Sequence, residues 1–350
     1  MEKHFDQQLF DNAHGISRRT FLTAAAGTLA YAGMPGFVHQ AFAAAPQSLV
    51  GKPVALGVSS VGATAVYPLL DGEHAFPLSL FKGADEAAML QAAGAQPIPG
   101  SFNVFLVERG KERYLIDTGI GTLFPGKTGR LLDALAEAQC PVKDVSIIFI
   151  THLHLDHIGG LVADGKPVFP GAYVYISEAE HAYWTSDAAM SKSPANCKTV
   201  REILAVLDAD LIADKEKRII LFKPDTALTK GSVADATGAL SSRRATDIKS
   251  VDLAGHTPGH SGFLLAPKGS SGPQMFFVGD LLHGAALQLP RPDITIDYDV
   301  DQDKAKKMRL STFDRIAKKV PIAGAHLPFP GIGFVQPEGK GYKLAPVVSK

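Results

Sequence analysis

The sequence predicts one layered α/β domain over residues 46–350, with strands in both halves and helices between them. Strand patterns and amphipathic helix patterns alternate along this range, and neither an internal repeat nor a linker-like segment divides it. The chain has 350 residues, 46% of them hydrophobic, which is enough to bury a substantial core. We therefore expect sheets and helices packed in layers.

The first half of the domain contains a strand pair, a helix and a buried strand. Phe102–Glu108 and Arg113–Asp117 are two predicted strands around the polar turn Arg109-Gly110-Lys111. Leucines at helical spacing predict a helix within Thr128–Gln139, which Cys140-Pro141 ends. Val145–Ile150 is a nearly continuous apolar run and is typical of a strand covered on both faces.

The middle of the chain continues the alternation. Ala172–Ile176 is a predicted strand, and Ser177–Trp184 is a predicted helix with its first Ser as N-cap and Glu180 at the capping-box position. Arg218–Phe222 is the next strand. Gly231–Arg244 is rich in Gly, Ser and Ala, so we expect a mobile surface loop there.

The second half is richer in strands and has one long charged helix. The predicted elements, in order, are the strands Lys249–Leu253, Gly262–Ala266 and Met275–Val278, the helix Asp301–Lys319, and the strands Pro321–Ala325, Gly333–Gln336 and Tyr342–Val347. The last two form a pair around a Gly-rich turn. These elements complete the expected α/β alternation.

Residues 1–45 are predicted to be an export signal outside the domain. Ser17-Arg18-Arg19-Thr20-Phe21-Leu22 resembles the twin-arginine signal, and no charged residue occurs from Thr20 to Gly51. Small residues at Ala41, Ala43 and Ala45 suit signal-peptidase cleavage. The resemblance implies the twin-arginine translocon as a partner and the periplasm as the destination.

An uncleaved membrane anchor is the alternative for this segment, because an uncharged stretch of such length can span a bilayer. Its glycines, Pro35 and His39 make a poor lipid-facing helix. Export with cleavage is therefore the preferred interpretation.

Charge and cysteine content limit the function. Lys and Arg number 35 and Asp and Glu also 35, with no basic block, so the footprint that nucleic acid needs is missing. The only cysteines, Cys140 and Cys197, cannot form a disulfide framework or a thiolate metal cluster, and whether they pair is left open. A metal site in this chain would use its histidines, 12 in all, and carboxylates.

Such a site is indicated directly after the buried strand. His152, His154, Asp156 and His157 place four potential ligands within six residues, a combination that suits Zn, Mn, Fe or Co. Four ligands crowded on one loop are difficult to direct at a single ion. Three histidines in so short a run are also not typical of a solvated loop, so two adjacent ions are the simplest explanation.

This motif resembles that of the metallo-β-lactamase superfamily. The resemblance implies an αββα sandwich of two mixed sheets flanked by helices. It also supplies the remaining ligands: His256 in the run Gly255–His260, Asp280 after Phe277-Val278-Gly279, and His326 after Ala325. Each of these follows a predicted strand or lies close to one.

The resemblance divides the ligands between two ions, zinc first, with manganese, iron or cobalt as alternatives. One ion takes His152, His154 and His256, the other takes Asp156, His157 and His326, and Asp280 bridges them together with a hydroxide. Asp156 and Asp280 are the candidate catalytic residues. Asp117 and His260 are expected to support the ligand loops, although Asp117 alone also fits a strand-end residue that caps a turn.

Further runs resemble the methyl parathion hydrolase group of this superfamily. They are Gly279–Gln288, Asp297–Asp303, His326–Gly333 and Gly339–Tyr342. The group hydrolyses lactones, aryl esters and, in some members, organophosphate triesters, and usually forms homodimers. The resemblance therefore implies a homodimer here as well.

Three residues are candidates for the substrate pocket. Phe124 and Trp184 match aromatic walls of the methyl parathion hydrolase group, although Trp184 equally fits ordinary packing. His283 either reaches the pocket or lies behind Asp280. Downstream, Ser193–Lys198 lacks the further aromatics of that group, which favours ester and lactone substrates over organophosphates.

The expected function is an exported binuclear hydrolase, in which a metal-bridging hydroxide attacks the carbonyl of a small uncharged lactone or ester. Acyl-homoserine lactones and organophosphate triesters are further substrates to consider. The alternatives are a redox enzyme on the same fold, such as a sulfur dioxygenase, a β-lactam hydrolase, and a non-catalytic metal binder. The full ligand set counts against the last.

Overall fold

The computed structural model describes residues 48–59, 62–94, 96–123, 128–212, 217–226, 228, 248–265 and 275–347. The expected export signal, the expected mobile loop Gly231–Arg244 and the pocket candidate Phe124 lie outside these residues. Within the described part, no helix is long and apolar enough to cross a membrane.

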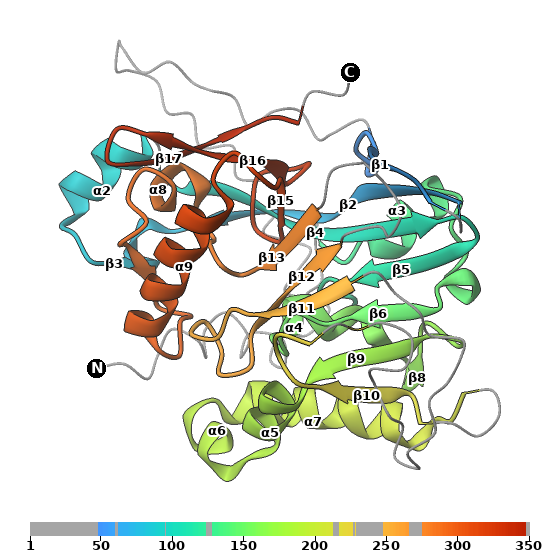
Figure 1. Ribbon diagram of the computed structural model, residues 1–350. Helices are drawn as coiled ribbons and strands as arrows, with labels where there is room; N and C mark the ends of the chain where they lie inside the picture. The colour runs from blue at the N-terminus through green and yellow to red at the C-terminus, as the bar shows by residue number, and fades with distance from the viewer. Residues whose placement is uncertain are drawn as a thin grey trace, which may run out of the picture.

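Two mixed sheets form the centre of the molecule (Figure 1). The first has the order β1-β2-β4-β5-β6-β9-β10. Its strands are β1 Val54–Ser59, β2 Gly62–Phe76, β4 Ile98–Arg109, β5 Glu112–Ile116, β6 Ile147–Phe149, β9 Tyr173–Ser177 and β10 Ile219–Phe222. In this sheet β1, β2, β4 and β5 pair antiparallel in that order, whereas β5, β6, β9 and β10 pair parallel.

The second sheet has the order β11-β12-β13-β15-β16-β17. Its strands are β11 Ile248–Asp252, β12 Ser261–Leu265, β13 Met275–Gly279, β15 Ile322–Gly324, β16 Ile332–Glu338 and β17 Gly341–Ala345. Only β13 and β15 pair parallel. Two short pairs, β3 Phe81–Lys82 with β14 Thr295–Ile296 and β7 Val162–Ala163 with β8 Lys166–Pro167, lie outside the main sheets.

Helices cover the outer faces of both sheets. They are α2 Glu86–Ala93, α3 Leu131–Glu137, α4 Leu155–Ile158, α5 Glu178–Thr185, α6 Asp187–Lys192, α7 Pro194–Ala209, α8 Ala285–Gln288 and α9 Gln302–Ile316. Figure 1 shows α9 beside the second sheet and α5, α6 and α7 near β9 and β10 of the first. The expected αββα sandwich is confirmed.

The core explains why these layers form. Aromatic residues of both sheets, such as Phe149 and Phe263, meet between them with ring centroids 5.2 Å apart. Ile148 points the other way, into the cluster beneath α3 and α7. The strand β6 is therefore buried on both faces, as its apolar sequence predicts.

The segments before Ile98 and the helix α7 lie outside the predicted elements. In α7, Val200, Ile203, Leu204 and Leu207 are buried at helical spacing, so the sequence did contain the signal for it. β2 has 15 residues and includes a register shift between Leu70 and Gly72, which interrupts its alternation. The predicted helices are otherwise longer than α3 and α9 by a few residues at their ends.

The capping-box prediction at α5 is wrong. Ser177 does occupy the N-cap position, but its hydroxyl makes no capping hydrogen bond. The Glu180 carboxylate is fully buried and accepts hydrogen bonds from other segments, so it does not turn back to the N-cap. Cys140 and Cys197 are both free and buried.

Candidate metal centre

All seven predicted ligands lie in segments that connect strands, at one shared edge of the two sheets. The run His152–His157 follows β6, and His256 lies in the loop between β11 and β12. Asp280 comes directly after β13, and His326 lies two residues after β15. Because β13 and β15 are parallel neighbours, their carboxyl ends place Asp280 and His326 side by side.

The motif loop turns sharply because glycines allow close backbone contact. His154 is the N-cap residue of α4, which carries Asp156 and His157. A Cβ atom on Gly159 would lie 2.2 Å from the Ile120 carbonyl oxygen, a distance that real side chains do not tolerate. The loop therefore packs on the segment after β5 only with glycine at this position.

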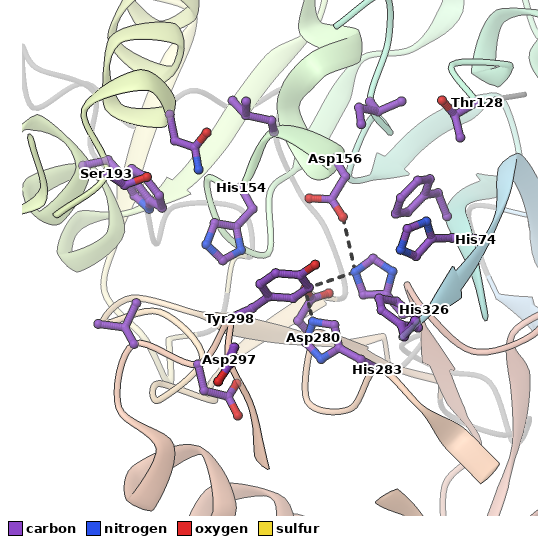
Figure 2. Close-up of a pocket in the computed structure, with 18 of the residues that line it drawn as sticks. His74, Thr128, His154, Asp156, Ser193, Asp280, His283, Asp297, Tyr298 and His326 are labelled. Atoms are coloured by element: carbon purple, nitrogen blue, oxygen red, sulfur yellow. Dashed lines mark hydrogen bonds and ion pairs between the residues drawn. The ribbon is translucent and has the colours of Figure 1, made fainter. Parts of the chain in front are cut away.

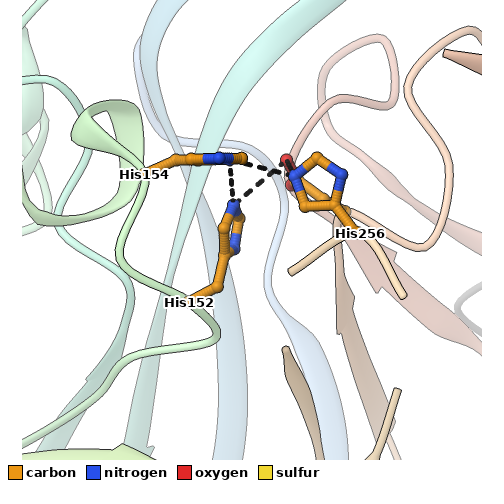
Figure 3. Close-up of side chains that lie close together, drawn as sticks. His152, His154 and His256 are labelled. Atoms are coloured by element: carbon orange, nitrogen blue, oxygen red, sulfur yellow. Dashed lines mark hydrogen bonds and ion pairs between the residues drawn. The ribbon is translucent and has the colours of Figure 1, made fainter. Parts of the chain in front are cut away.

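Three imidazoles converge in the first ligand cluster (Figure 3). The Nδ1 atom of His154 lies 2.8 Å from Nε2 of His152 and 3.0 Å from Nε2 of His256. The Oδ2 atom of Asp280 lies 3.2 Å from Nε2 of His256 and 3.5 Å from Nε2 of His152. These are the four residues that can enclose one ion.

The second cluster shares Asp280 with the first. The Nε2 atom of His326 lies 3.1 Å from Oδ2 of Asp280 and 3.4 Å from Oδ2 of Asp156. The Nε2 atom of His157 lies 3.2 Å from Oδ1 of Asp280 and 3.7 Å from Oδ2 of Asp156. Asp280 thus stands between the two clusters, and their membership matches the predicted division.

The outer nitrogens of these histidines are held by the protein. Nδ1 of His256 lies 2.9 Å from Asp299, and Nδ1 of His157 lies 2.8 Å from Asp117. Nδ1 of His326 lies 3.2 Å from the Ser101 carbonyl oxygen. Partners of this kind fix the ring orientation, so the inner nitrogens face the shared space.

The donor atoms fit divalent ions. His157 Nε2 and Asp280 Oδ1 are buried without a hydrogen-bond partner among the described groups, which is costly unless another species binds there. Burial and neighbouring histidines hold the pKa values of His152 and His154 well below the usual range. Despite burial, the surrounding histidines hold the pKa of Asp280 well below normal, so it is an anion and a suitable ligand.

At two of the predicted ligands, His256 and His157, a metal ion has to compete with a proton. Burial lowers the pKa of His256, but its bonds to Asp280 and Asp299 outweigh this and raise it to about 9. Asp280, Asp117 and Asp156 likewise outweigh burial and raise the pKa of His157. Since imidazole binds metal only when neutral at the ligating nitrogen, ion binding here releases protons.

The two predicted supporting residues occupy distinct places. Asp117 has a left-handed backbone with φ of 61° and accepts hydrogen bonds from Thr151 N at 2.8 Å and Thr151 Oγ1 at 2.8 Å. His260 lies 3.1 Å from both the Leu253 carbonyl oxygen, through Nδ1, and the Asp280 backbone N–H, through Nε2. Both ring nitrogens of His260 are therefore engaged, and it positions Asp280.

Three carboxylates at the site were not predicted to belong to it. Asp299 holds His256, and Asp71 accepts hydrogen bonds from the backbone N–H groups of Ile120 and Leu131, each at 2.9 Å. Burial raises the pKa of Asp71 to about 6. Glu180 is the third. Of the three, only Asp299 lies in a run named for its resemblance to the methyl parathion hydrolase group, Asp297–Asp303.

Glu180 joins the two halves of the site. Its Oε1 atom accepts from Leu153 N at 3.0 Å and from Trp184 Nε1 at 2.7 Å. Its Oε2 atom accepts from Thr257 Oγ1 at 2.7 Å and from Gly259 N at 2.9 Å. One carboxylate therefore ties the motif loop, α5 and the His256 loop together.

A cavity of about 390 Å³ opens over the clusters (Figure 2). Trp184 and His283 line it, as predicted for the substrate pocket. Trp184 is also buried against the core, so pocket and packing roles coincide. His283 Nε2 lies 3.1 Å from Asp280 Oδ2, and its ring stacks on His326 with centroids 4.8 Å apart.

His74 lines the same cavity, although no role was predicted for it. Its ring stacks on Phe102 with centroids 4.9 Å apart, and burial lowers its pKa to about 4. His283 also fits a third grouping with Asp280 and His326 that could enclose an ion. Burial lowers the pKa of His283 to about 4 as well.

The fold and the paired His and Asp clusters define a metal-dependent hydrolase of the αββα type. The family model of the metallo-beta-lactamase superfamily matches residues 98–319, and the chain belongs to this superfamily. None of the curated proteins compared with the chain matches it.

Solved structures agree with this assignment. The hydrolase AbOPH of the beta lactamase superfamily is 30% identical, with a TM-score of 0.71 over 85% of this chain and 100% of its own. AidC, a dizinc quorum-quenching lactonase solved with the product N-hexanoyl-L-homoserine, is 25% identical, with a TM-score of 0.67 over 87% of this chain and 99% of its own. A probable metal-dependent hydrolase from Staphylococcus aureus, 17% identical with a TM-score of 0.56 over 83% of this chain and 100% of its own, shares the fold.

Proposed function

We propose that this protein hydrolyses lactones and carboxylic esters with two divalent ions, zinc first. The observation that carries the proposal is the position of Asp280, whose two carboxylate oxygens face both ligand clusters at the base of the cavity. A carboxylate shared in this way is the arrangement that a two-metal hydrolase requires.

When bound, the ions supply Lewis acidity, which lowers the pKa of water and polarises the carbonyl under attack. The chain supplies position and proton handling. The Asp156 carboxylate is 18% exposed and lines the cavity, so it can accept a proton from the attacking water and return it to the leaving oxygen. His283, held beside Asp280, borders the space where the substrate carbonyl would lie.

The cavity walls favour an uncharged substrate. Phe76, Phe102, Ile120, Leu155 and Trp184 give it apolar surface. Such walls reward burial of an ester or lactone and its hydrocarbon arm. AidC, the similar structure described as a lactonase, holds an acyl-homoserine product, which supports lactones as the first class to test.

Export and assembly belong to the same proposal. The Arg18-Arg19 pair and the uncharged stretch after it support delivery to the periplasm by the twin-arginine translocon, with cleavage near Ala45. The resemblance to the methyl parathion hydrolase group supports a homodimer. Size-exclusion chromatography with light scattering and N-terminal sequencing of the exported protein test these two points.

A substrate panel tests the activity itself. Purified protein is assayed for bound metal and then for initial rates on dihydrocoumarin, N-hexanoyl-L-homoserine lactone, 4-nitrophenyl acetate and methyl paraoxon. We expect two ions per chain, the highest kcat/KM on a lactone or ester, and slower turnover of the phosphotriester. A β-lactam and a persulfide are assayed alongside as alternatives. Fewer than two ions per chain, or turnover of one of these alternatives and of none of the four panel compounds, would contradict the proposal.

A further inference from the structure

One part of the cavity wall is polar. Lys192 is the last residue of α6, Ser193 joins α6 to α7, and Asn196 lies in the first turn of α7, and all three line the cavity. Tyr183 and Trp184 of α5 lie beside them on the lining. Figure 2 shows Ser193 and His154 on one side of the cavity and His74 and Thr128 on the other.

Asn196 is the unusual member of this wall. The residue is only 8% exposed, and its amide has no hydrogen-bond partner among the described residues but stays open to the cavity. Its neighbours Cys197 and Val200 are buried and apolar. The amide thus faces the cavity and not a protein partner, so a polar side chain at this position of α7 is available to a ligand.

The contrast with Asn103 supports this reading. Asn103 is also buried, at 3% exposure, and its Nδ2 atom donates to the carbonyl oxygens of Gly324 at 3.0 Å and Leu327 at 2.7 Å. The fold thus satisfies the NH₂ group of Asn103, although its Oδ1 atom is buried without a partner among the described residues. The amide of Asn196 instead borders the cavity.

Further donors surround Asn196. α7 has 16 residues, and the hydroxyl of its N-cap residue Ser193 makes no capping bond to the N–H groups of the first turn. Lys192 lines the same cavity. Glu73 and Asp297 also line the cavity, and their charge disfavours an anionic ligand.

We infer that Asn196, supported by Lys192 and the first turn of α7, binds a secondary amide in the arm of the substrate that points away from the scissile carbonyl. The inference rests on the proposed hydrolase function and names the substrate class that this site prefers. The Asn196 carbonyl accepts from the amide N–H, and its NH₂ group and the nearby donors bind the amide oxygen. A neutral amide satisfies both halves of the side chain, which a carboxylate or a plain alkyl chain does not.

Matched lactones test the inference by activity. N-hexanoyl-L-homoserine lactone and γ-nonalactone share the ring, and only the first carries an amide. We expect Asn196→Leu to lower kcat/KM on the amide substrate by roughly tenfold or more, mainly through KM, and to change γ-nonalactone less than about twofold. Lys198→Ala, on an exposed residue of the same helix that does not line the cavity, is the control and should change neither.

Binding gives a readout that does not depend on turnover. Trp184 is the only tryptophan of the chain and lines the cavity, so its fluorescence reports occupancy. Titration with N-hexanoyl-L-homoserine should give a Kd about tenfold weaker for Asn196→Leu than for the parent protein. Asn196→Asp nearly keeps the shape of the side chain and should also weaken binding. It replaces Asn196→Leu if that variant does not fold.

The outcomes separate the two ideas. Equal losses on both lactones, or no loss on either, would overturn the role of Asn196 and leave the hydrolase proposal standing. If the parent protein hydrolyses neither the lactones nor 4-nitrophenyl acetate, the proposed function fails, and the fluorescence titration alone then decides the inference. An Asn196-dependent Kd would support it, and an unchanged Kd would reject it.

Discussion

The two ends of the cavity are built on different principles. At the base, the outer nitrogens of His157, His256 and His326 each have a protein partner, and two carboxylates hold the first two of them. At the α6–α7 wall, the amide of Asn196 has no hydrogen-bond partner among the described residues. The protein thus fixes the polar groups of the base through its own contacts, whereas the wall leaves a polar group open to the cavity.

The largest expected effect comes from breaking the base at the residue that both clusters share. Asp280→Ala removes both oxygens that face the clusters, so we expect loss of at least one ion per chain and a decrease in kcat/KM of about a thousandfold or more. Metal analysis and initial rates measure this. Asp303→Ala, 87% exposed on α9, is the control, and an Asp280→Ala protein with normal activity would refute the bridging role.

The next effect tests the joint between base and wall. Glu180→Gln places an NH₂ group against two of the four donors that Glu180 satisfies, so we expect unfolding to become easier by about 2–4 kcal/mol. Chemical denaturation measures this free energy. Glu178→Gln on the exposed face of the same helix is the matched control, and an equal change in both would show that the buried contacts contribute little.

A smaller effect is expected from the support of the motif loop. Asp117→Asn removes the acceptor for the His157 Nδ1–H while it nearly keeps the shape, so we expect a roughly 10–100-fold loss of metal affinity or activity. Competition with a chelator measures the affinity. Asp133→Asn, on an exposed residue of α3, should have no effect, and a wild-type affinity for Asp117→Asn would reject the positioning role.

The smallest effect concerns acid sensitivity beside the base. Burial lowers the pKa of His74 from 6.5 to about 4, so this residue contributes stability that is present above pH 6.5 and is lost as the pH falls toward 4. His74→Gln should reduce the loss of stability between pH 7 and 5.5 by about 1 kcal/mol. Thermal unfolding at both pH values measures this, with His181→Gln as control. Equal pH dependence in His74→Gln and the parent protein would contradict the assignment.

Much of the fold follows from local sequence patterns. The apolar run around β6 and the strand pair β4 and β5 were predicted because neighbouring residues decide them. The whole of β2 was missed, and its register shift interrupts the alternation of its residues. Glu180 was wrongly predicted to be a capping residue. Its real partners, Thr257 and Gly259, are 77 and 79 residues away in the sequence, so no local pattern contains them.

By itself the sequence determined the chemistry of the ligands, because His152, His154, Asp156 and His157 lie within one loop and their spacing is covalent. Tertiary structure alone decided how that loop meets the rest of the site. His154 and His256 are 102 residues apart, yet their ring nitrogens lie 3.0 Å apart. Only the packing of two sheets creates such proximity, and the same packing left the amide of Asn196 facing the cavity.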